Sequence, residues 1–141
     1  MSRFLPPTLD VVFKILFASP EAKDCLISLL TAVLHPAVPI TDVEVLNPEI
    51  AKEAIGDKGV VLDLLARLAD GTEVDVEMQV DRRAGFRKRL LCYWAKSFVR
   101  QLGRGQPYTA LRPMVLVVFL CHEDTAAERL HSEFRLLETH D

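Results

Sequence analysis

Two short segments flank Asp70-Gly71, and their side-chain patterns predict a β-hairpin. In residues 73–80 polar and apolar side chains alternate at every position, which is typical of a strand with one buried face. In residues 60–68 one set of alternate positions is entirely apolar, whereas the other set is mixed and contains Asp63. A hairpin of this kind constrains the fold strongly, because shifting the strand pairing by one residue would expose a whole apolar face.

The length of the turn decides which residues of the two segments pair. A two-residue loop at 70–71 would place Asp63 opposite Met78 and would mix polar with apolar residues along the pair. A three-residue loop over 69–71 puts glycine at the left-handed position that such loops favour, and it matches the two apolar faces. The pairs expected for this loop are Leu62 with Met78, Leu64 with Val76, Ala66 with Val74, Arg67 with Glu73, and Asp63 with Glu77.

Asp63 and Glu77 are the first candidate site. An ionised carboxylate inside an apolar strand costs several kcal/mol, roughly, unless a partner compensates for its lost hydration. Two carboxylates that face each other with Cβ atoms about 5 Å apart either share a proton or bind a divalent cation. The alternative for Glu77 is an ordinary solvated residue on an exposed face. For Glu73 and Asp75, on the same face, we expect that simpler role.

An ordered set of segments resembles the PD-(D/E)XK nuclease family transposases, which are also called recombination-promoting nucleases. These segments are residues 10–14, 58–63, 70–71, 76–79, 89–93 and 105–108. The resemblance implies an α/β fold with a mixed sheet, namely a restriction-endonuclease-like PD-(D/E)XK core in the order helix, three strands, helix and strand. It also implies a metal-dependent DNA endonuclease that hydrolyses phosphodiester bonds and is associated with transposition or recombination.

The resemblance assigns roles to individual residues. It implies that Asp63 and Glu77 bind Mg²⁺ or Mn²⁺, and that the backbone carbonyl of Met78 lies close to the metal. Gln79 occupies the position of the family lysine and is the third catalytic candidate, since a neutral amide can still hydrogen-bond a water. The accessory candidates are Asp10 and Lys58.

Residues 84–102 are predicted to form a basic helix. Between residues 82 and 104 there are eight basic residues and no acidic one, although the whole chain has a net charge of −3. An apolar residue at every fourth position, from Phe86 to Leu102, predicts the buried side of this helix. Another side of the helix is a candidate contact with the DNA backbone, the alternative being a solvated face. Its residues are Arg89, Tyr93, Lys96 and Arg100.

The rest of the chain is expected to complete a single domain over residues 1–141. We expect a helix over residues 19–34, a strand over 40–46, a central strand over 114–121 and an edge strand over 131–137. The resemblance implies that longer relatives have a C-terminal extension that this chain lacks. Three widely separated cysteines and the absence of a long apolar run predict a cytoplasmic protein without a membrane segment.

A non-catalytic protein is the competing interpretation. The neutral Gln79 and the short chain both favour a nuclease fold that only binds DNA or serves as a dimerisation module. Such a protein would pair with a second copy as a homodimer, or with a full-length relative. A plasmid-nicking assay with and without Mg²⁺ separates the two classes.

Overall fold

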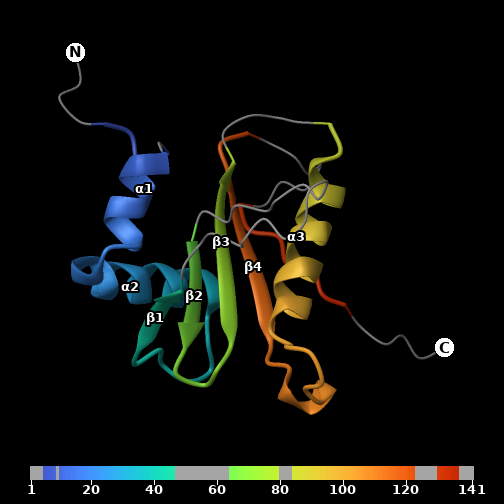
Figure 1. Cartoon of the computed structure of the whole chain (residues 1–141). Helices are drawn as coiled ribbons and strands as arrows, with labels where there is room; N and C mark the ends of the chain where they lie inside the picture. The colour runs from blue at the N-terminus through green and yellow to red at the C-terminus, as the bar shows by residue number, and fades with distance from the viewer. Residues whose placement is uncertain (1–4, 9, 47–63, 80–83, 123–129, 137–141) are drawn as a thin grey trace.

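The computed structural model describes residues 5–8, 10–46, 64–79, 84–122 and 130–136 (Figure 1). Its elements are α1 (Asp10–Phe17), the 3-10 helix η1 (Pro20–Ala22), α2 (Lys23–Leu34), β1 (Val43–Leu46), β2 (Leu64–Leu68), β3 (Glu73–Gln79), α3 (Phe86–Arg100), the 3-10 helix η2 (Tyr108–Ala110) and β4 (Met114–Leu120). The order of helices, three strands, helix and strand confirms the predicted α/β core.

The described strands form one sheet in the order β1-β2-β3-β4. β1, β2 and β3 are antiparallel neighbours, whereas β3 and β4 are parallel and are connected through α3. A parallel pair needs such a crossover, because a tight turn joins only antiparallel strands. The sheet is therefore mixed, as predicted.

The prediction that residues 114–121 form a central strand was wrong, because β4 lies at an edge of the described sheet. The apolar run has another cause. Val117 packs with the helices on one face of the sheet and Met114 packs beneath α3 on the other, so both faces of this edge strand are covered. Residues 131–136 form no strand, so the predicted final edge strand is also wrong over those residues.

The hairpin pairing agrees with the prediction wherever both partners are described. Leu64 pairs with Val76, Ala66 with Val74, and Arg67 with Glu73. The turn also has the predicted three-residue loop. The Leu68 backbone N–H donates to the Thr72 carbonyl at 2.8 Å, and Gly71 adopts φ +88°. A positive φ is the conformation that this loop requires and that glycine adopts without strain.

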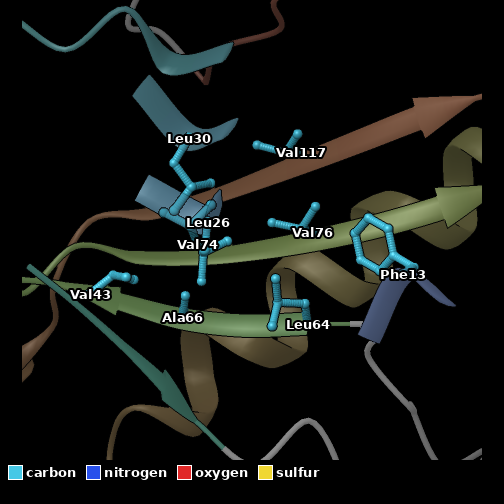
Figure 2. Packing of buried hydrophobic residues seen from close by; sticks show 9 residues of the cluster. All are labelled: Phe13, Leu26, Leu30, Val43, Leu64, Ala66, Val74, Val76 and Val117. Atoms are coloured by element: carbon cyan, nitrogen blue, oxygen red, sulfur yellow. The ribbon is translucent and has the colours of Figure 1, made fainter. Parts of the chain in front are cut away.

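One face of the sheet packs against α1 and α2 and forms the larger apolar core (Figure 2). Phe13 of α1 and Leu26 and Leu30 of α2 are buried there against alternate residues of the strands. Fully burying each such side chain stabilises the fold by about 1.5–3 kcal/mol relative to leaving it exposed. The strand residues in this core are Val43, Leu64, Ala66, Val74, Val76 and Val117.

The opposite face of the sheet is covered by α3 (Figure 1). Trp94 anchors the helix, because its Nε1–H donates to the Met114 carbonyl at 2.9 Å. Glu73 and Asp75 lie on this face and are buried, so the prediction that they are solvated was wrong. The alternating pattern identified the apolar face correctly, but it could not show that a helix connected much later in the chain covers the polar face.

The buried side of α3 also differs from the predicted stripe. Phe86 and Ser97 are the buried residues of this helix, whereas Leu90, Trp94 and Phe98 are partly buried. The helix thus rests on the sheet along a side that includes small and polar residues. This orientation brings the basic residues of α3 close to β3.

Candidate active site

The polar row of β3 runs along the sheet face that α3 covers. Its residues, at alternate positions, are Glu73, Asp75, Glu77 and Gln79. Glu77 and Gln79 are half-buried, and their neighbours across the parallel pair are Val118 and Leu120 of β4. This end of β3 therefore combines a carboxylate and an amide on an otherwise apolar surface, as in a site that binds a polar ligand.

Arg89 of α3 reaches across to this end of the polar row. Its guanidinium Nη2 donates a hydrogen bond of 2.5 Å to Oε1 of Gln79. The guanidinium carbon also lies 5.6 Å from the ring centroid of Phe86 and 5.8 Å from that of Tyr93. The buried Nε–H of Arg89 has no hydrogen-bond partner within the described part of the chain. Two aromatic rings and the amide thus hold a positive charge beside Gln79.

Met78 lies between the two polar residues but turns its side chain to the other face, against the larger core. Its backbone orientation follows from the ladder between β3 and β4. The Glu73 N–H donates to the Pro113 carbonyl at 3.0 Å, and the Gln79 carbonyl accepts from the Cys121 N–H at 3.1 Å. The backbone groups of the odd-numbered residues of β3 therefore hydrogen-bond to the β4 side. The alternation of backbone groups therefore directs the Met78 carbonyl to the β2 side.

Two predicted site residues, Asp63 and Lys58, lie outside the described residues, so the predicted pair of Asp63 with Glu77 is not described. Asp10 is the first residue of α1, and its side chain is not described. Within the described ranges, no group of three or more His, Cys, Asp or Glu side chains is arranged to hold a metal ion.

The predicted DNA-contacting side of α3 contacts β3 at two places. Arg89 contacts Gln79, and Nη2 of Arg100 lies 3.2 Å from Oε2 of the buried Glu73. Lys96, between them, is exposed. The distance from Arg89 to Arg100 along the helix, about 16 Å for eleven residues, is similar to the distance from Glu73 to Gln79 along the strand, about 20 Å for six residues. The helix therefore runs antiparallel to β3, with one arginine near each end of the polar row.

Of the two ion pairs of Glu73, the pair with Arg67 was predicted and the pair with Arg100 was missed by sequence reasoning. Besides Arg100, Glu73 accepts a hydrogen bond of 2.8 Å from Nη2 of Arg67, its partner across the hairpin. The predicted pairing already placed Arg67 opposite Glu73, so half of this arrangement was visible in the sequence. The contribution of Arg100 depends on how α3 docks.

Residues 7–141, nearly the whole chain, match the family described as PD-(D/E)XK nuclease family transposase. The chain belongs to this family. Membership agrees with the mixed sheet and the order of elements, which are those of a restriction-endonuclease-like fold. Nucleases of this kind act on DNA and generally use divalent metals.

Neither a curated protein nor a solved structure matched the chain. Of the helices that the structure describes, none combines the length and the apolar character needed to cross a membrane.

Proposed function

We propose that the protein is a metal-dependent DNA endonuclease that hydrolyses phosphodiester bonds in transposition or recombination. One observation carries the proposal: Glu77 and Gln79 share a sheet face, and Arg89 donates to Gln79 there. The pairing of β2 with β3 supports Asp63 as the second carboxylate, since Asp63 directly precedes Leu64, the partner of Val76.

The oxygen atoms of Asp63 and Glu77, together with the Met78 carbonyl, would hold Mg²⁺ or Mn²⁺. Carboxylate and carbonyl oxygens are the ligands that these hard cations prefer, so the donor set fits. When bound, the metal polarises the phosphoryl oxygen and lowers the pKa of an attacking water. Asp10 and Lys58 remain accessory candidates for this site.

Arg89 would supply the positive charge that Gln79 lacks. An amide does not take up a proton at neutral pH, so Gln79 orients a water and does not deprotonate it. Its Oε1 accepts from Arg89, so a hydrogen bond donated to water or phosphate would come from the amide nitrogen. A guanidinium beside this amide can stabilise the negative charge that develops on the scissile phosphate.

Tyr93 and Lys96 would complete the DNA contacts on α3. The Tyr93 ring lies beside the Arg89 guanidinium, and Lys96 is exposed on the same helix. Contacts to phosphates carry little sequence information, so weak sequence preference is expected.

A plasmid-nicking assay tests the proposal. The wild-type chain should nick supercoiled DNA with Mg²⁺ or Mn²⁺ and not with a chelator. Asp63→Asn and Glu77→Gln should each lower the rate at least about a hundredfold, because each removes a charged ligand. Lys88→Gln, which removes an exposed charge beside Arg89, is the matched control.

Cleavage that persists in Asp63→Asn would refute the assigned site. The neutral Gln79 favours a second candidate, in which the chain binds DNA or pairs with another copy without cutting. DNA binding by a wild-type chain that does not nick with either metal would support that candidate.

A further inference from the structure

A second polar site lies at the opposite end of the polar row from Gln79. It is an open hollow of about 590 Å³, bounded by the hairpin turn, the end of α3 and the segment before β4. Three arginines from three separate parts of the chain line it, together with a single acid. They are Arg67, Arg100 and Arg112, with Glu73 as the acid.

Glu73 fixes two of these arginines. Its side chain is only 5% exposed, and it lies 2.8 Å from Nη2 of Arg67 and 3.2 Å from Nη2 of Arg100. Arg67 also lies 3.6 Å from Glu44, an exposed residue of β1. One buried carboxylate therefore holds two guanidinium groups at the wall of the hollow before any ligand arrives.

Arg112 is held in a different way. Its backbone is clamped by the Gln101 amide, which accepts from the Arg112 N–H at 2.7 Å and donates to its carbonyl at 3.3 Å. Its side chain passes over Gly71, where an added Cβ would lie 3.4 Å from Arg112 Cδ. None of the ion pairs between described residues includes Arg112. Three arginines and one glutamate leave the lining with a charge of +2.

We propose that this hollow binds a phosphate group, with Arg112 as the principal contact and Arg67 and Arg100 at its sides. A guanidinium matches the oxygens of a phosphate through paired N–H donors. Because Glu73 already positions the Arg67 and Arg100 side chains, these two lose little freedom when the anion binds. The phosphate comes either from a nucleic-acid backbone or from a small phosphorylated compound.

This site is separate from the proposed metal site. Glu73 and Glu77 are four residues apart on β3, about 13 Å along the strand. Of the site residues that the structure describes on β3, neither Glu77 nor Gln79 lines the hollow. Phosphate binding here thus does not depend on cleavage, and it can be measured without a divalent metal.

The test is a titration of the full chain with inorganic phosphate and with pyrophosphate at constant ionic strength, followed by the arginine Nε–H signals in NMR spectra. Saturable shifts are expected for Arg112 and Arg100. Arg112→Gln should weaken phosphate binding about tenfold, the effect of losing one charge-assisted contact. Arg104→Gln removes the same charge from an exposed residue outside the lining, and it should retain the wild-type affinity.

Glu73→Gln should change the phosphate affinity in the opposite direction to Arg112→Gln, because it removes the negative charge of the hollow and leaves all three arginines. It should strengthen phosphate binding severalfold in the folded protein, with folding checked by circular dichroism. Glu77→Gln should bind phosphate as the wild type does, even if it abolishes cleavage. If Glu77→Gln loses cleavage and keeps phosphate binding, the result shows that the proposed metal site and the phosphate-binding hollow act independently.

A duplex oligonucleotide distinguishes the two sources of phosphate. If the ligand is a DNA backbone, Arg112→Gln should also weaken duplex binding and reduce its salt dependence by about one unit of slope. If only free phosphate binding falls, the ligand is a small phosphorylated compound. Non-saturable shifts, or equal losses in Arg112→Gln and Arg104→Gln, would overturn the proposal.

Discussion

The guanidinium of Arg89, on α3, donates a hydrogen bond of 2.5 Å to the side-chain oxygen of Gln79, on β3. The family resemblance implies a lysine at the position of Gln79, and under the proposed function Arg89, ten positions further along the chain, would supply the missing positive charge. The contact joins the end of the polar row to the basic helix. The role of this contact in cleavage can be tested by removing the positive charge from position 89 and introducing one at position 79.

Under the proposed function, Arg89→Gln should lower the DNA cleavage rate about a hundredfold, because it would remove the cation that stabilises the scissile phosphate. Gln79→Lys in the same chain should recover much of the loss, since the lysine restores the charge on β3. Nicking rates of the two single variants and the double variant measure this coupling. Additive losses in the double variant would show that Arg89 does not substitute for the lysine.

Mg²⁺ should raise the melting temperature of the wild-type chain, because a cation that binds only the folded state stabilises it. Asp63→Ala should abolish this shift, since it removes one of the two proposed carboxylate ligands. Differential scanning fluorimetry over a range of Mg²⁺ and Ca²⁺ concentrations provides the measurement. An equal shift in the wild type and in Asp63→Ala would exclude Asp63 as a ligand.

Glu73→Gln should lower the free energy of unfolding by about 1.5–3 kcal/mol, the range for hydrogen bonds to charged groups. The lower end is favoured because the Arg67 and Arg100 side chains are 45% and 33% exposed and can be rehydrated. Glu44→Gln, at an exposed acid 3.6 Å from Arg67, should cost less than about 0.5 kcal/mol. Urea denaturation of both variants tests the difference, and equal effects would contradict it.

Lys96 and Arg100 should differ in what their removal changes. Lys96→Gln should weaken duplex binding and reduce the salt dependence by about one unit of slope, with unchanged stability, because Lys96 is exposed. Arg100→Gln should lower stability, because it removes a partner of the buried Glu73. Fluorescence anisotropy and urea denaturation separate these effects. Lys23→Gln, on the opposite side of the sheet, is the control for net charge.

The turn of the hairpin should weaken in acid. The backbone N–H of Thr72 donates to Asp70 at 2.8 Å and lowers the pKa of the Asp70 carboxyl. Because the folded-state pKa lies below the unfolded value of about 3.9, this stabilisation is present above that pH and is lost as the pH falls through the folded pKa.

Asp70→Ala should therefore be destabilising by about 0.5–1.5 kcal/mol at pH 7 and by less at pH 3. Asp70→Asn keeps an acceptor that does not titrate, so its stability serves as the control across the same pH range. Thermal unfolding at a series of pH values measures both variants. A penalty for Asp70→Ala that does not change with pH would contradict the assignment.

The hairpin could be predicted from the sequence because its determinants are local. Gly71 requires a left-handed conformation, and the apolar residues on either side match only when the loop has three residues. Three of the six segments that carry the family resemblance, residues 58–63, 70–71 and 76–79, lie in or next to the same hairpin. The predicted role of Gln79 rested on its position two residues after Glu77 in this strand.

The placement of α3 could not be predicted in the same way. The sequence by itself determined the hairpin pairing, the order of the elements and the candidate residues, because each depends on neighbours in the chain. Only the tertiary structure decided that the polar row is covered, that Arg89 contacts Gln79, and that Arg100 contacts Glu73. These contacts depend on how a helix rotates as it docks on a sheet, and local alternation of side chains carries no information about that rotation.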